Sequence, residues 1–172
     1  MYVTPAQLAE SPRAQEIAQC ATPDNTAVVG TALMDAVLRG RDVSTFPADQ
    51  VAIAQDALAR VNTLIVDAER LIDGYVGKRY TLPFVDAPPI MTTWARAIVR
   101  YWLHKDLNAD DKGNPIVRDY RDAISFLQQI AAGKFSLGAG DPTGSGGSGL
   151  VEVSAPGRVF TNDTLRDFGG GL

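Results

Sequence analysis

The sequence has one cysteine and one histidine among 172 residues. A single cysteine, Cys20, excludes a disulfide within the chain and a zinc site built on cysteines, and it fits a reducing compartment. His104 has no other histidine or cysteine near it in sequence, so we expect it to interact with the end of a helix rather than with a metal. The series from Asp106 to Val117 begins like a calcium loop, but it lacks the glycine at position 6 and the glutamate at position 12. We therefore predict no metal site.

The sequence also lacks the patterns of a catalytic or cofactor site. Its glycine-rich stretch, 138–149, is not followed by the Gly-Lys-Ser/Thr of a phosphate-binding loop. The carboxylates of Asp67, Glu69 and Asp73 are not spaced to share one helical face. Cys20 and His104 are far apart in sequence, so a nucleophile and base would have to pair that histidine with a serine or threonine that nothing marks. We predict no catalytic residue, no cofactor and no enzyme activity.

No segment of the chain is basic. Basic and acidic residues number three and five in 1–46, eleven and eleven in 47–137, and two and four in 138–172, giving a net charge of −4. This balance argues against a grip on duplex DNA by phosphate neutralisation. A small helical DNA-binding regulator remains an alternative, but it would need a basic recognition helix. No apolar run reaches the length of about 20 residues that a membrane span needs, and no signal peptide is evident, so we expect a soluble protein.

The dominant feature is a long amphipathic pattern between Gln50 and Phe84. Apolar residues recur at intervals of three and four from Ile53 to Val76, which predicts one long helix, and 77–84 forms a sharp exit. Cap and proline signals predict the other helices. These are a short one after Thr4, one from Pro12 to about Cys20, and others over 28–38, from Pro89 and from Asn114 to Gly133. The predicted fold is all-α, a small helical bundle around a long central helix with an extended C-terminal arm.

The composition changes after the last predicted helix. We assign 1–137 to a helical domain, 138–149 to a flexible Gly/Ser-rich linker, and 150–172 to an extended arm with apolar anchors. An anchored arm behind a tether is typical of a segment that orders on a neighbouring molecule. A disordered tail with incidental phenylalanines is the alternative.

Two sets of side chains on the helix after Pro89 suggest contacts. Trp94 and Trp102 lie on one stripe with Ile98, so a place in the core is favoured over a stacking platform for single-stranded nucleic acid. Arg96 and Arg100 are a like-charged i,i+4 pair on another face. Each arginine is a candidate to pair with an acidic residue, either within the chain or across a subunit boundary.

Several motifs together resemble a known family. Ile72-Asp73-Gly74-Tyr75, Arg79-Tyr80-Thr81-Leu82-Pro83, the elbow Pro88-Pro89, and a helix containing Arg100-Tyr101-Trp102 are similar to Mu-like phage head-to-tail connector (adaptor) proteins. The resemblance covers residues 1 to about 138. It implies an all-helical virion subunit in the neck, made in the host cytoplasm. It also implies a ring, expected to be dodecameric, beneath the portal of a tailed phage, with its channel open for DNA passage.

The same resemblance implies the partners. These are the portal protein, further copies of the chain, and a stopper or tail-completion protein, whereas DNA passes without sequence-specific binding and no membrane is involved. Residues 20–46 and the long arm depart from the short form of the family, and we interpret 20–46 as an insertion. A stopper or tail-completion role is the alternative, although such proteins tend to be β-rich. The predicted portal or subunit interface consists of Val159, Phe160, Leu165, Arg166 and Phe168 in the arm, with Arg96 and Arg100.

Overall fold

The computed structural model describes residues 1–104 and 113–138, and these are helical, with no strand among them. This confirms the predicted all-α bundle around a long helix. Most of the linker and the whole arm lie outside the described residues. The elements are α1 (Pro5–Leu8), a π-helical turn η1 (Ala9–Arg13), α2 (Ala14–Ala21), α3 (Thr31–Leu38), α4 (Ala48–Val76), α5 (Pro89–His104) and α6 (Pro115–Ala131).

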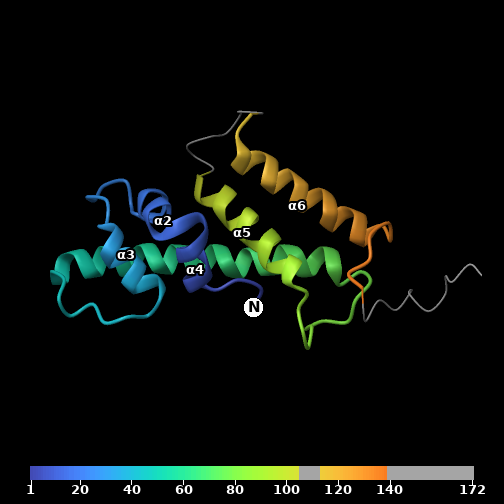
Figure 1. Cartoon of the computed structure of the whole chain (residues 1–172), viewed down its shortest axis with the longest axis horizontal. Coiled ribbons are helices and arrows are strands. Elements are labelled where there is room, and N and C mark those ends of the chain that lie inside the picture. The colour runs from blue at the N-terminus through green and yellow to red at the C-terminus, as the bar shows by residue number, and fades with distance from the viewer. Residues whose placement is uncertain (105–112, 139–172) are drawn as a thin grey trace, which may run out of the picture.

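Helix α4 runs the length of the described bundle, with α2, α5 and α6 above it and α3 crossing its N-terminal half (Figure 1). Helices α2 and α3 cover its N-terminal half, while α5 and α6 cover its C-terminal half. The buried stripe of α4 has the three-and-four spacing seen in the sequence, and each of its members is fully buried. The stripe consists of Ala54, Ala57, Val61, Ile65, Ala68, Ile72 and Val76.

Three helix ends, two of them on α6, have the expected capping residues. Thr4 and Gln7 form a reciprocal capping box at α1, with N···O distances of 3.2 and 2.9 Å. The side chain of Asn114 accepts a hydrogen bond from the Ile116 amide at 2.9 Å and so caps α6. Gly133 follows α6 with a φ of +75°, a conformation that favours glycine, and thereby lets the chain turn away.

Two predicted helix starts were wrong. Helix α2 begins at Ala14 and not at Pro12, because Ser11 is extended and Arg13 has a φ of +113°, so neither residue continues a helix. Helix α3 begins at Thr31, three residues after the predicted start at Val28. Within the segment interpreted as an insertion, α3 buries Leu33 and Met34 in the common core.

The motif residues after α4 join the exit of that helix to the exit of α6. The buried Tyr80 packs against Phe84, and its hydroxyl accepts a hydrogen bond from the Leu137 amide at 2.9 Å. A Cβ on Gly77 would lie 2.8 Å from the Asp73 carbonyl oxygen, so the turn requires glycine. The motif therefore has a structural role, since it fixes where the chain after α6 leaves the bundle.

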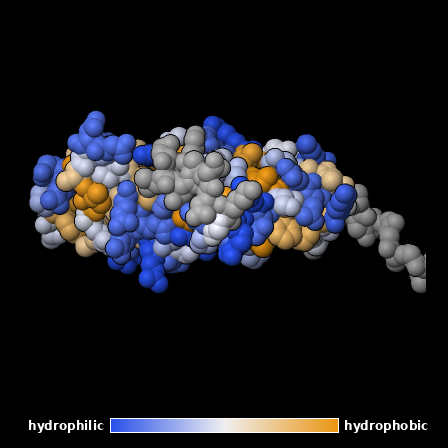
Figure 2. Space-filling model, turned by 90° about the horizontal axis from the view of Figure 1, so that it is seen from above, coloured by the Kyte–Doolittle hydropathy of each residue, from blue (hydrophilic) through white to orange (hydrophobic). Residues whose placement is uncertain are grey.

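The visible surface is mixed. Seen from above, apolar residues form separate patches between hydrophilic ones rather than one broad face (Figure 2). Within the described part of the chain, no helix combines the length and apolar character needed to cross a membrane.

Candidate functional site

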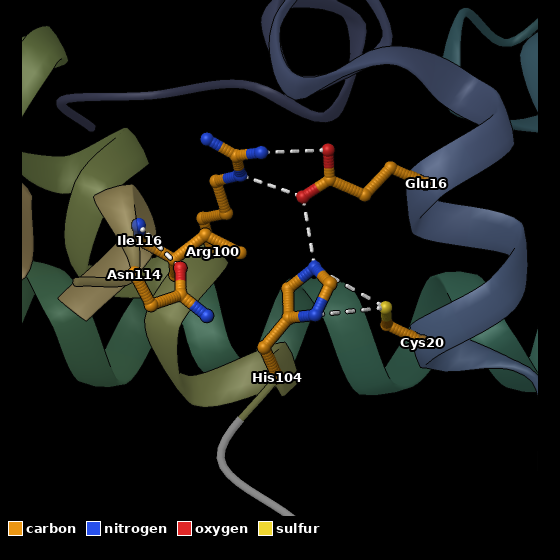
Figure 3. Close-up of polar contacts among 6 residues, drawn as sticks. All are labelled: Glu16, Cys20, Arg100, His104, Asn114 and Ile116. Atoms are coloured by element: carbon orange, nitrogen blue, oxygen red, sulfur yellow. Dashed lines mark hydrogen bonds and ion pairs between the residues drawn. The ribbon is translucent and has the colours of Figure 1, made fainter. Parts of the chain in front are cut away.

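Four polar side chains meet where α2 faces α5. Helix α2 contributes Glu16 and Cys20, and α5 contributes Arg100 and His104 (Figure 3). Each pair is spaced i,i+4, which places both members on one face of their helix. The two faces point toward each other, so residues more than 80 positions apart in sequence form one cluster.

Glu16 is the centre of this polar cluster. Arg100 donates two hydrogen bonds to its carboxylate, from Nε to Oε1 at 2.6 Å and from Nη2 to Oε2 at 2.9 Å. His104 Nε2 lies 2.8 Å from the same Oε1 (Figure 3). The side chains of Glu16, Arg100 and His104 are only 23, 31 and 13% exposed. A bidentate arginine–carboxylate pair of this kind is short, directional and charge-assisted, so it fixes α2 on α5.

The neighbouring thiol raises the question of nucleophilic chemistry. Cys20 Sγ lies 3.3 Å from Nε2 and 3.5 Å from Nδ1 of His104. A nucleophile–histidine–carboxylate triad needs the thiol and the carboxylate on opposite ring nitrogens. Here Glu16 binds Nε2, and the sulfur is nearly equidistant from both nitrogens rather than in line with one lone pair. The geometry does not fit a triad.

The electrostatics of Cys20 lead to the same conclusion. The side chain is buried, with 8% exposure, and burial together with the nearby Glu16 carboxylate raises the pKa of the thiol above its usual value. A raised pKa disfavours the thiolate, which is the reactive form. Among the described residues, no group of three or more His, Cys, Asp and Glu side chains is arranged to hold a metal ion. The polar cluster is suited to joining two helices.

A groove of about 370 Å³ adjoins the polar cluster, and Arg100 belongs to both. Its volume is at the lower end of the range for ligand-sized pockets, roughly 300–1,000 Å³. The walls are mostly apolar, and Trp94 stacks on Phe126 with ring centroids 6.0 Å apart. The groove lies between η1, α5 and α6 and is lined by Ser11, Pro12, Ile90, Thr93, Trp94, Arg96, Ala97, Arg100, Asp119, Asp122, Ala123 and Phe126.

The two predicted interface arginines have different environments. Arg100 has an acidic neighbour within the chain, Glu16, which was one of the two alternatives. Arg96 lines the groove, and its Nε is buried without a hydrogen-bond partner among the described residues. The other predicted interface residues, Val159, Phe160, Leu165, Arg166 and Phe168, lie outside the described part of the chain.

The aromatic residues of α5 face other parts of the same chain. Trp94 is buried in the core, as predicted. Trp102 is partly buried against that core. Tyr101 stacks on Tyr120 of α6, with ring centroids 4.0 Å apart. With these faces occupied, the side chains do not form an open platform for stacking bases.

Sequence reasoning missed the meeting of Glu16, Cys20 and His104. It treated the single cysteine and single histidine as unrelated because of their separation. The i,i+4 spacings of Glu16 with Cys20 and of Arg100 with His104 were visible, but nothing in the sequence indicated that the two faces would oppose each other.

Comparison with known proteins gives a consistent set of relatives. The family model described as "Bacteriophage Mu, Gp36" matches residues 2–153. The Mu-like prophage FluMu protein gp36 of Haemophilus influenzae is 36% identical over 112 residues, covering 64% of this chain and 76% of the relative. Gene product J of Escherichia phage Mu is 30% identical over 130 residues, covering 74% of this chain and 83% of the relative. No solved structure gives a significant match.

Proposed function

We propose that this chain, which belongs to the bacteriophage Mu Gp36 family, is a structural component of the virion and acts as a head-to-tail adaptor. It forms a ring, expected to be dodecameric, under the portal and leaves a channel for DNA. Its place is the neck of the virion, after assembly in the host cytoplasm.

One observation carries the proposal beyond family membership. Two of the motifs that resemble the adaptor proteins, Ile72–Tyr75 and Arg79–Pro83, lie where α4 ends, and Tyr80 binds the backbone at Leu137, one residue before the described chain ends. They therefore hold the point from which the linker and arm depart. A fixed departure point suits an arm that binds a neighbour, because a tether raises the effective concentration of the arm at its target.

Assembly, rather than catalysis, is the proposed mechanism. The polar cluster geometry does not suit a nucleophile, and the net charge of −4 suits a wall past which DNA moves without being held. The partners are the portal protein, neighbouring copies and a stopper or tail-completion protein. A role as that stopper is the second candidate, and the helical character of the described residues makes it weaker because stoppers tend to be β-rich. A DNA-binding regulator is weaker still because no segment is basic.

The test is the mass and electron-microscope image of the protein alone and after mixing with its portal ring. We expect a ring of this protein on the portal with matching stoichiometry. A protein that stays monomeric and does not bind the portal would overturn the adaptor role.

The arm is tested by deleting 149–172. Because every described helix lies before residue 139, we expect an unchanged circular dichroism spectrum and melting temperature, but loss of portal binding or ring formation. Assembly equal to that of the full chain would show that the arm is not the binding element.

A further inference from the structure

The connection between α4 and α5 carries an exposed apolar tip. Val85 is 98% exposed, and the adjacent Asp86 is exposed and forms no ion pair with another described residue. In Figure 1 this connection projects below α4, on the side away from α6. Single exposed apolar residues are common, but a nearly fully exposed valine at a projecting tip gains from burial in a partner.

The stem of this tip is held in place on both sides. Phe84 is partly buried against the core and contacts the ring of Tyr80. Pro88 and Pro89 follow the tip, and proline fixes the backbone φ angle. A tip whose conformation is restricted before binding loses less entropy when it docks.

The groove between α5 and α6 has the complementary features. Its apolar walls include Trp94, Ala97 and Phe126, and the Nε of Arg96 is buried there without a hydrogen-bond partner among the described residues. A buried donor without a partner costs free energy that an incoming carboxylate would recover. No residue of 84–88 lines the groove of its own chain.

From these features we infer that Val85 and Asp86 of one copy dock in the α5–α6 groove of the next copy, with the Asp86 carboxylate on Arg96. Val85 packs on the apolar wall. This rests on the proposed ring and names the contact that would close it. Tip and groove are different surfaces, so the contact is head-to-tail, the kind that generates a ring when its rotation closes.

The experiment uses the full chain, first by itself and then with the portal. Native mass spectrometry measures the concentration at which half of the chain is in rings. The variants are Val85→Asp, Asp86→Arg, Arg96→Glu and the double variant D86R/R96E. We expect each single variant to raise the half-assembly concentration about tenfold or more, since anchors at a contact dominate its affinity. The double variant should recover most of the loss, because the charges are exchanged. Val85 and Asp86 are exposed, so their substitution leaves the fold intact.

Matched controls are Asp24→Arg and Arg121→Glu, which change exposed charges outside the tip and groove. They should assemble like the unmodified chain. Rings that form equally well with Val85→Asp and Asp86→Arg would overturn this contact while leaving the adaptor role intact. An unmodified chain that forms no ring, alone or on the portal, would overturn the adaptor role itself.

Discussion

Arg96 and Arg100 are one turn apart on α5, yet they lie in opposite environments. Arg100 donates two hydrogen bonds to Glu16 and is part of a closed polar cluster. The Nε of Arg96 is buried in the wall of an open groove and has no partner among the described residues. Both side chains are partly buried, so the difference is whether the described part of the chain supplies an acceptor.

Arg100 makes a contact that holds the subunit together, whereas Arg96 is placed for a contact with a partner. A satisfied bidentate pair stabilises the fold and is unavailable to a partner. An unsatisfied buried donor costs stability in the free subunit, roughly 1–3 kcal/mol for a typical group. That cost can be recovered when a partner brings a carboxylate. Arg100 therefore belongs to folding, while Arg96 is the better candidate for recognition.

The largest expected effect comes from breaking the internal joint. Glu16→Ala leaves Arg100 and His104 partly buried without their acceptor, so we expect the free energy of unfolding to fall by about 2 kcal/mol, measured by urea denaturation. Asp67→Ala is the matched control, because its pair with Arg70 is solvent-exposed and should change stability by less than ~0.5 kcal/mol. Equal effects for the two variants would mean that the polar cluster does not hold α2 on α5.

A smaller effect concerns the thiol inside the polar cluster. Burial and Glu16 raise the pKa of Cys20, so less thiolate exists at a given pH. At pH 8 we expect Cys20 to react with a disulfide reagent about tenfold or more slowly in the folded protein than in urea. Glu16→Gln should speed the reaction by lowering that pKa.

The same raised pKa predicts the direction of a pH effect on stability. The protonated thiol is favoured in the folded state, so its contribution is full below the unfolded thiol pKa of about 8.5 and is lost as the pH rises above it. The Cys20→Ala variant should therefore lose less of its free energy of unfolding than the unmodified chain as the pH rises above that value. A thiol that reacts equally fast in the folded and unfolded chain would contradict the buried placement.

The smallest expected effect is that of replacing Arg96, and its sign distinguishes Arg96 from Arg100. Arg96→Met keeps a long unbranched side chain on the groove wall and removes the unpaired Nε. We expect the free energy of unfolding to stay unchanged or rise by up to about 1 kcal/mol. The measurement is the same urea titration used for Glu16→Ala. A loss above ~1 kcal/mol would show that Arg96 already has a stabilising partner.

Much of the fold could be predicted because its signals are local. The three-and-four spacing along α4 defines a buried stripe by itself, and Thr4, Asn114 and Gly133 mark helix ends through their own backbone and side-chain chemistry. The start of α2 was missed because Ser11-Pro12 looks like a cap followed by proline. In the folded chain, Ser11 is extended and Arg13 has a positive φ, so the helix is delayed to Ala14.

The sequence by itself determined the all-α class, the central helix and the motifs that show the family. Helical periodicity and capping depend on residues within a few positions of one another, so they can be seen in the sequence alone. Only the tertiary structure decided that Glu16 would pair with Arg100, while the Nε of Arg96 has no acceptor among residues 1–104 and 113–138. That outcome depends on which face of α2 packs on α5, and it brings together residues 84 positions apart.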